Sequence, residues 1–273
     1  MPWPDGLKQA PKALFALRAD PRVSWCAHVP ASFAAAPDEH RLVVAVHGSS
    51  RGVTALRDAF AAHAERHRWV VLAPLFPVGI RGDGEADGYK NLVEGEIRYD
   101  RLLLAMIEEL EAVLGARFPT FGLFGFSGGG QFAHRFAYLH AARLWGAVIG
   151  APGAVTRLDD RLGWWLGTRD FAEVFGAPLD LDALRKVPLQ LLVGDQDLAE
   201  LKIPPALAKK LEPLGDIGRN RVERMGLLLR NYLENGLDAS LHLVPGVGHQ
   251  GLRCVDAGAD FLAAIPHTTG AQA

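Results

Sequence analysis

The chain has little of the chemistry that marks disulfide-rich, metal-binding or membrane proteins. Its 273 residues include only two cysteines, Cys26 and Cys254, and neither belongs to a Cys-x-x-Cys motif. We therefore expect two buried free thiols in a reducing compartment, and no disulfide framework. No apolar run approaches the roughly 20 residues that a helix needs to span a bilayer, so we expect no membrane segment.

The chain also lacks a large excess of charge of either sign, with 29 Lys and Arg against 31 Asp and Glu. The formal net charge of −2 gives no reason to expect a nucleic acid or an anionic membrane as a partner. Residues 1–6 lack a basic region followed by an apolar stretch, so we expect no signal peptide and a cytoplasmic location. Hydrophobic residues make up 49% of the chain and no linker-like stretch divides it. A single domain over residues 1–273 is therefore expected.

Strand-like and helix-like segments alternate along the sequence. We expect strands at residues 22–28, 42–46, 69–75, 121–126, 144–149, 187–193 and 240–244. We expect helices at residues 54–67, 97–114, 217–235 and 252–265, and a further one directly after residue 127. This alternation predicts an α/β fold with a mostly parallel twisted sheet and helices on both faces. Ligands of such sheets bind outside the carboxyl ends of the strands.

A Gly-x-Ser-x-Gly motif joins an apolar strand-like run to an amphipathic helix-like run. It reads Gly-Phe-Ser-Gly-Gly over residues 125–129, with Ser127 at its centre. This layout is typical of a nucleophile elbow, where a strained turn lifts the serine hydroxyl clear of the backbone. Only small residues fit two positions before and after such a serine, and Gly125 and Gly129 fill both. We predict that Ser127 is a nucleophile; the alternative is a glycine-rich connection without chemistry.

A nucleophilic serine needs a base to take its proton, and a histidine usually does this. His249 lies in the glycine-rich loop 245–251 directly after a predicted strand, where catalytic side chains are often held. The other histidines after the serine fall on the next helix, inside a strand or in a polar tail: His134, His140, His242 and His267. We predict His249 as the base; the alternative is a solvent-exposed loop histidine.

The acid that orients this base is expected after the strand predicted at residues 187–193. Asp195 and Asp197 both follow it directly. Asp195 would begin the turn, where an aspartate often accepts a hydrogen bond from its own backbone two residues on. Asp197 lies further out in the loop and is free to reach a histidine. We predict Asp197 as the acid, with Asp195 as the alternative.

The donors that stabilise an oxyanion are expected in two loops. One is a backbone N–H after the early strand at residues 42–46, and the other belongs to the residue after the nucleophile. We assign the first to Ser49, with Ser50 as the alternative, and the second to Gly128. His47 precedes the nucleophile in the chain, so we expect it to hydrogen-bond the loop and to have no catalytic role.

Together these motifs resemble those of the α/β-hydrolase superfamily, over about residues 20–265. The resemblance rests on His47-Gly48, Gly125-Phe-Ser-Gly-Gly129, Gly194-Asp-Gln-Asp197 and Gly248-His249. Within the superfamily the chain is most similar to small-capped esterases such as the dienelactone hydrolase and polyester depolymerase relatives. The resemblance implies no cofactor, and acyl transfer from a small ester to water through an acyl-enzyme.

Residues 154–186 form too long a connection for two neighbouring strands. The resemblance implies that a small cap is inserted here, over the active site. Trp164 and Trp165 either line an acyl or aromatic pocket or pack the cap against the body. Tyr89 is a further candidate for the pocket. The arginines of the segment are either surface charges or favour an anionic substrate.

Two sequence patterns resemble metal-binding motifs, but neighbouring residues argue against a metal site in each case. Residues 83–94 nearly match a calcium loop, but the proline-containing segment 73–77 cannot form the entering helix, and Glu85 takes the third ligand position. His63 and His67 share a helical face without forming His-Glu-x-x-His. We expect no metal site, a solvated loop in the first case and surface histidines in the second.

The leading hypothesis is a serine hydrolase of small to medium carboxylic esters. A second hypothesis keeps the triad but applies it to an amide, a lactone or a carbon–carbon bond. A third is a non-catalytic binding protein that retains the pocket. The sequence does not indicate the natural substrate or the oligomeric state.

Overall fold

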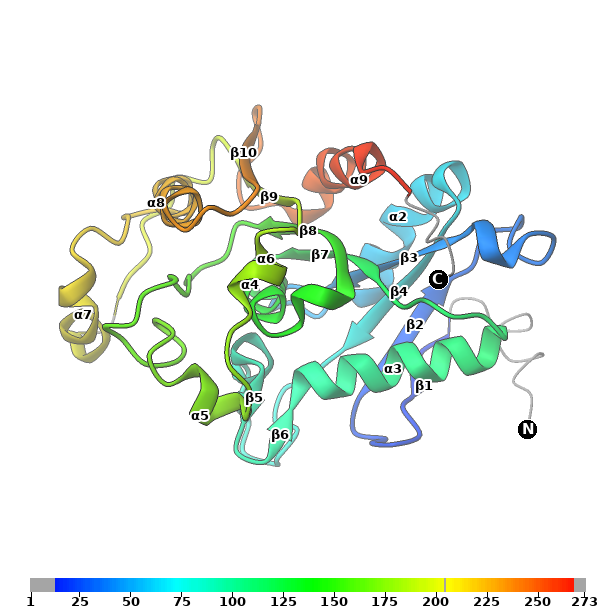
Figure 1. Cartoon of the computed structure of the whole chain (residues 1–273), viewed down its shortest axis with the longest axis horizontal. Coiled ribbons are helices and arrows are strands. Elements are labelled where there is room, and N and C mark those ends of the chain that lie inside the picture. Colours follow the sequence, from blue (N-terminus) through cyan, green and yellow to red (C-terminus); the bar gives the residue numbers. More distant parts are fainter. Residues whose placement is uncertain (1–12, 204, 268–273) are drawn as a thin grey trace.

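The computed structural model describes residues 13–203 and 205–267 (Figure 1). In these residues eight strands form one sheet in the order β1-β2-β4-β3-β7-β8-β9-β10. The first six residues, where we expect no signal peptide, lie outside the described part. No helix among the described residues is long and apolar enough to cross a membrane.

The strands of the main sheet are β1 (Phe15–Ala16), β2 (Ser24–His28), β3 (Arg41–Val46), β4 (Trp69–Leu75), β7 (Phe121–Phe126), β8 (Leu144–Gly150), β9 (Leu189–Gly194) and β10 (Ala239–Val244). The α-helices are α2 (Val53–His67), α3 (Tyr99–Leu114), α4 (Gly128–His140), α5 (Phe171–Phe175), α6 (Leu181–Leu184), α7 (Pro205–Leu211), α8 (Arg221–Glu234) and α9 (Val255–Ala264). Short 3₁₀ turns are η1 (Pro37–Glu39), η2 (Gly88–Asn91), η3 (Ala141–Arg143), η4 (Glu212–Leu214) and η5 (Gly251–Cys254).

The sheet is parallel from β4 to β10, and β2 and β1 extend it antiparallel at the other border. Its central strands are almost fully buried, because their runs of valine, leucine and phenylalanine face helices on both sides. The mostly parallel α/β sheet predicted from the sequence is therefore confirmed.

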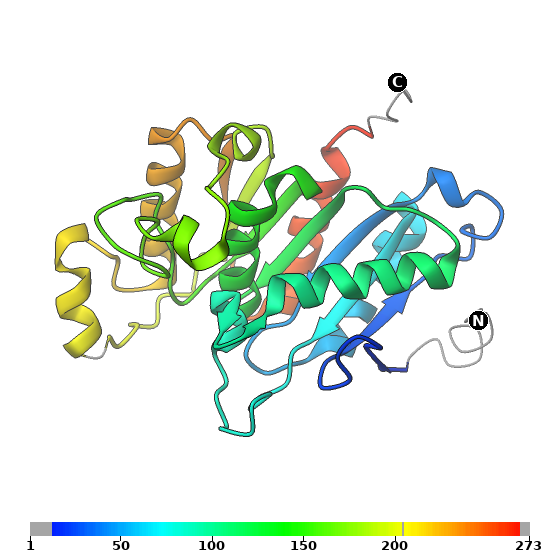
Figure 2. The ribbon, with the colours of Figure 1, turned by 60° about the horizontal axis from the view of Figure 1, so that its bottom comes forward.

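Helices cover both faces of the sheet (Figure 2). On one face α3 and α4 both pack on Phe76, whose ring lies 5.3 Å from that of Tyr99 and 5.5 Å from that of Phe132. On the other face α2 and α9 pack against each other and against the strands. Gly258 permits this close approach of α9, since a Cβ there would lie 2.7 Å from the ring of Phe124.

Three predicted helices begin later than the sequence pattern indicates. Residues Ile97–Arg98 form strand β6, which pairs with β5 (Val93–Glu94), so α3 starts only at the next residue. Helix α8 begins after Asn220, whose side chain accepts a hydrogen bond from the backbone N–H of Glu223 at 2.9 Å. Gly218 has φ +75°, which excludes the helix predicted across it. The last predicted helix is divided into η5 and α9.

Two long excursions leave the sheet and lie at the same end of the molecule (Figure 1). Residues 154–186, the predicted cap, contain α5 and α6. Residues 195–220 contain α7 and were not predicted as an insertion. The guanidinium of Arg157 joins the two by donating from Nη1 to the carbonyl of Leu214 at 3.0 Å.

Both cysteines are free and buried, as predicted. Burial raises the pKa of each thiol to about 11. The thiols are therefore protonated at neutral pH and are poor nucleophiles.

Candidate active site

Ser127 occupies a sharp turn between β7 and α4. Its backbone angles are φ 57° and ψ −114°, a strained conformation for a residue with a side chain. The turn is held by a 2.8 Å hydrogen bond from the N–H of Ser127 to the carbonyl of Gly150. The strand-to-helix elbow predicted from the motif is therefore present.

The glycines on either side of the serine allow the backbone to pack this tightly. A Cβ on Gly125 would lie 2.1 Å from the carbonyl oxygen of Gly129. A Cβ on Gly129 would lie 2.1 Å from the carbonyl oxygen of Val46. Any side chain at either position would force the elbow apart, which explains the small residues in the motif.

The structure brings Ser127, His249 and Asp197 into one chain of hydrogen bonds. His249 Nδ1 lies 2.6 Å from Asp197 Oδ2, and His249 Nε2 lies 2.9 Å from Ser127 Oγ. Because an ionised carboxylate only accepts, Nδ1 carries the imidazole proton. Nε2 is then free to accept from the serine hydroxyl.

The two candidate aspartates have different partners. Asp197 is 2% exposed, and its second oxygen, Oδ1, accepts from Nη1 of Arg221 at 3.3 Å. Asp195 points elsewhere and accepts from the N–H of Gly246 at 2.8 Å, which ties its loop to the turn after β10. The expected bond of Asp195 to its own backbone is replaced by this contact between loops.

The surroundings of His249 keep it neutral. Burial lowers its pKa below the ordinary value of 6.5, and the positive charge of Arg221 lowers it further. The hydrogen bond to Asp197 acts in the opposite direction and offsets part of this effect. A neutral imidazole at pH 7 can accept a proton, as a general base must.

His47 anchors the loop after β3, as predicted for a structural residue. Its Nε2 accepts from the backbone N–H of Phe76 at 3.0 Å, and its Nδ1 donates to the carbonyl of Gly48 at 2.8 Å. Burial lowers the pKa of His47 to about 4, so the ring is neutral. His47 thus fixes the loop that carries Ser49 without reaching the serine hydroxyl.

Arg51 was missed in the sequence and holds the same loop from its other end. Its guanidinium donates to the carbonyls of Ser49 at 2.7 Å, Phe76 at 3.3 Å and Ala86 at 2.5 Å. It also lies over the ring of Tyr89, 5.0 Å from the centroid. No local pattern reveals this role, because two of the three carbonyls, Phe76 and Ala86, belong to the loop after β4.

Ser49 and Gly128 lie next to each other. A Cβ on Gly128 would be 3.2 Å from Ser49 Oγ, whereas the Oγ of Ser50 lies beside Gly52. Gly128 opens α4, and the first N–H groups of a helix have no partner within it. This arrangement favours Ser49 over Ser50 as the neighbour of the elbow.

A cavity of about 570 Å³ opens over the serine. Its polar lining comes from His47, Ser49, Ser50, Ser127, Arg221 and His249. Its apolar walls come from β3, α2, the elbow and η5, through Val46, Ala55, Leu56, Phe126 and Leu252. A cavity of this size matches the usual range for small-molecule sites.

The three residues predicted for the pocket do not line this cavity. The indole N–H of Trp164 donates to the carbonyl of Asn91 at 3.0 Å, and its ring packs edge-on against Phe175 at 4.8 Å. The ring of Trp165 lies 4.9 Å from the guanidinium carbon of Arg135. Both tryptophans thus pack residues 154–186 against the rest of the molecule, and they line a separate cavity of about 490 Å³.

Tyr89 lies beneath the loop after β3 and is 1% exposed. Its hydroxyl donates to the carbonyl of His47 at 3.3 Å, and a Cβ on Gly128 would lie only 2.2 Å from it. Tyr89 therefore supports the loop from below, where a substrate cannot reach it.

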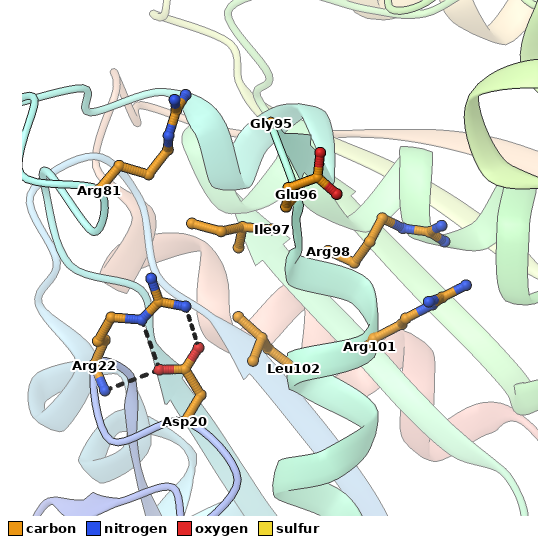
Figure 3. Close-up of a pocket in the computed structure, with 9 residues that line it drawn as sticks. All are labelled: Asp20, Arg22, Arg81, Gly95, Glu96, Ile97, Arg98, Arg101 and Leu102. Atoms are coloured by element: carbon orange, nitrogen blue, oxygen red, sulfur yellow. Dashed lines mark hydrogen bonds and ion pairs between the residues drawn. The ribbon is translucent and has the colours of Figure 1, made fainter.

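A second cavity, of about 530 Å³, lies by the hairpin β5–β6 (Figure 3). Ser127, His249 and Asp197 are not among the residues that line it. Four arginines contribute to it, and three of them, Arg22, Arg81 and Arg98, are paired with carboxylates. Arg22 donates from Nε and Nη2 to Asp20 at 2.8 and 2.6 Å, and Arg98 donates to Asp100 at 2.8 Å. The cavity at Ser127 is therefore the candidate active site.

Neither metal-like pattern forms a ligand cluster. Within residues 13–203 and 205–267, no group of three His, Cys, Asp or Glu side chains is placed to hold a metal ion. His63 corrects one expectation, because it is 7% exposed and so is not a surface histidine. Its Nε2 bonds Asp256 at 2.8 Å, which joins α2 to α9.

No protein-family model matches the chain, and no match is found among curated proteins. Solved structures do match. A poly(3-hydroxybutyrate) depolymerase from Bordetella parapertussis is 25% identical, with a TM-score of 0.70 over 90% of this chain and 88% of that one. A poly(aspartic acid) hydrolase-1 from Sphingomonas sp. KT-1 is 22% identical, with a TM-score of 0.69 over 87% and 91%.

More distant structures agree on the fold. A ferulic acid esterase is 16% identical, with a TM-score of 0.57 over 91% of this chain and 93% of that one. An S-formylglutathione hydrolase from Agrobacterium tumefaciens is 17% identical, with a TM-score of 0.53 over 88% and 87%. The chain therefore has the α/β-hydrolase fold, in a form similar to that of esterases and a polyester depolymerase.

Proposed function

We propose that the protein is a serine hydrolase that cleaves small to medium carboxylic esters through an acyl-enzyme. The observation that carries this proposal is the chain of hydrogen bonds from Asp197 through His249 to Ser127 Oγ, at the base of an open cavity. The likeness in fold to esterases and to a polyester depolymerase supports it.

In the first half of the reaction, Ser127 Oγ attacks the ester carbonyl carbon while His249 Nε2 takes the hydroxyl proton. Asp197 stabilises the imidazolium that forms. The carbonyl oxygen becomes an oxyanion and accepts from the backbone N–H groups of Ser49 and Gly128. The tetrahedral intermediate then collapses, the carbon–oxygen bond to the alcohol breaks, and His249 gives its proton to the leaving oxygen.

In the second half, water replaces the alcohol. His249 Nε2 takes a proton from water as the water oxygen attacks the acyl carbon of the Ser127 ester. The same two N–H groups stabilise the second oxyanion. Collapse breaks the bond to Ser127 Oγ, which regains its proton from His249. The products are one carboxylic acid and one alcohol, and the enzyme returns to its starting state.

The cavity suits an acyl group of modest size. Leu56, Phe126 and Leu252 supply apolar surface within a volume of about 570 Å³, and polar groups face the same space. We therefore expect short and medium acyl or aryl esters to be hydrolysed faster than long-chain lipids.

Labelling by a fluorophosphonate probe tests the proposal, because only an activated serine reacts. We expect the native protein to be labelled and to hydrolyse 4-nitrophenyl acetate, and Ser127→Ala to do neither while keeping its circular dichroism spectrum. Labelling of Ser127→Ala at the native rate would place the nucleophile elsewhere. A native protein that is neither labelled nor active on esters would support the binding-protein hypothesis.

The same triad could act on an amide, a lactone or a carbon–carbon bond. Comparing kcat/KM for a matched ester, amide, lactone and β-diketone of one acyl length would decide between these reactions. We expect the ester to have the highest kcat/KM. A higher kcat/KM for the amide, the lactone or the β-diketone would identify that bond as the one the protein cleaves.

A further inference from the structure

Arg221 places one cation in the cavity over Ser127. It is the first residue of α8 and directly follows the second excursion from the sheet. Among the described residues that line this cavity, none is an aspartate or a glutamate. His47 and His249 also line it, but burial lowers the pKa of both. The fixed charge facing a substrate is therefore positive.

Most of the hydrogen-bonding capacity of Arg221 is unused. A guanidinium has five N–H groups. Within the described part of the chain, Arg221 makes one hydrogen bond, from Nη1 to Asp197 at 3.3 Å. Its Nε is buried without a partner. Arg22 makes the contrast clear, since its Nε and Nη2 both bond Asp20 at 2.8 and 2.6 Å (Figure 3).

Asp197 needs only one of the N–H groups of Arg221. Oδ2 of Asp197 is already bonded by His249 at 2.6 Å, and one N–H of Arg221 serves Oδ1. The side chain of Arg221 is only 16% exposed, so a ligand would meet its remaining N–H groups in a partly dry site. Because Nε is buried, the Nη end is the part that can meet a ligand in the cavity.

We propose that Arg221 binds a carboxylate of the substrate, so that the preferred esters carry an anionic group close to the scissile bond. A planar guanidinium matches the geometry of a carboxylate, and a partly dry site strengthens the contact. The carboxylate would belong to the acid or the alcohol part of the ester, as at the end of an oligomer of a hydroxy acid. This inference rests on the proposed ester hydrolysis.

The test uses two activated esters of the same chain length, one with a charged and one with a neutral far end. Mono-4-nitrophenyl adipate carries a free carboxylate, and its methyl ester is neutral at the same chain length. We expect native kcat/KM to favour the charged ester by roughly 10-fold or more, the size of a hydrogen bond to a charged group. In Arg221→Gln this preference should disappear, chiefly through a higher KM for the charged ester.

Arg219→Gln is the matched control. It removes the same charge two residues away, from a side chain that is 83% exposed, pairs with Glu223 and does not line the cavity. We expect it to retain the native preference. Loss of the preference in both variants would point to long-range electrostatics and would overturn the assignment to Arg221.

The outcomes separate the two proposals. Hydrolysis of neither ester by native protein would refute the proposed function. Equal native rates on both esters would refute only the carboxylate site. A loss in Arg221→Gln by the same factor on both esters would mean that Arg221 acts only by holding Asp197.

A measurement on the native protein alone covers the case in which Arg221→Gln does not fold. Hexanoate and hexanamide have the same chain length and differ in charge. As competitive inhibitors of the neutral ester, hexanoate should bind at least 10-fold more tightly than hexanamide. Equal inhibition constants would overturn the inference.

Discussion

Replacing Asp197 by asparagine should inactivate the protein without disturbing its fold. The change keeps the shape of a side chain that is 2% exposed and removes its charge. Arg221 only donates hydrogen bonds, so the amide oxygen of asparagine will turn toward Arg221 Nη1. The amide NH₂ then faces His249 Nδ1, where the carboxylate accepted a hydrogen bond at 2.6 Å.

That orientation selects the wrong tautomer of His249. Facing a donor, Nδ1 must accept, so the imidazole proton moves to Nε2. A protonated Nε2 cannot accept from Ser127 Oγ, which lies 2.9 Å away. In a well-studied serine protease the equivalent change lowers kcat about 10⁴-fold, or about 5.5 kcal/mol of transition-state stabilisation. We expect a loss of similar size here.

Asp195→Asn is the control, because it makes the same chemical change two residues away. Asp195 accepts from the N–H of Gly246 at 2.8 Å, and an amide oxygen can accept that bond equally well. Its kcat should fall less than about 10-fold, since a neutral hydrogen bond replaces a charged one. Steady-state hydrolysis of 4-nitrophenyl acetate and a thermal melt of each variant provide the measurement. Equal losses, or a larger loss at Asp195, would refute the assignment of the acid.

Three further predictions, on pH dependence, the loop after β3 and the cavity wall, test other parts of the site. Because burial holds the pKa of His249 below 6.5, kcat/KM should fall with decreasing pH through a midpoint below 6.5. Arg221→Gln should raise that midpoint, since the positive charge lowers the pKa; an unchanged pH profile would contradict the electrostatic effect. Arg51→Ala should lower kcat about 10- to 100-fold with little change in KM, because it releases the loop that carries Ser49, the proposed oxyanion donor. Leu252→Ala should shift the preference toward longer acyl chains in a panel of 4-nitrophenyl esters, whereas Trp164→Ala should lower Tm and leave that preference unchanged.

The parts of the site that were predictable follow from short stretches of sequence. Ser127 lies in a motif whose glycines are required by backbone contacts within the elbow itself. Asp197 and His249 follow apolar runs that end where two parallel strands end. Since neighbouring parallel strands bring their carboxyl ends together, residues 52 positions apart could be expected to meet.

The remainder depends on contacts that no local pattern encodes. The guanidinium groups of Arg51 and Arg221 bond residues of the site. Other arginines of the sequence, such as Arg22, only pair with a carboxylate nearby in the chain, and the sequence does not distinguish the two cases. Trp164 and Trp165 are residue types that often line a pocket, yet in the fold the indole N–H of Trp164 bonds the carbonyl of Asn91. Helix α8 starts late because Asn220 is its N-cap residue. This is a short-range signal, but the apolar periodicity continues before it and predicted an earlier start.

The proposed nucleophile and base differ in how firmly the sheet holds them. Ser127 follows β7, which has β3 on one side and β8 on the other. His249 follows β10, which is the border strand and pairs only with β9 among the described strands. Border strands open locally at lower free energy than central ones. Heating should therefore separate the base from an intact elbow first, so that activity fades reversibly at temperatures where the central sheet is still folded.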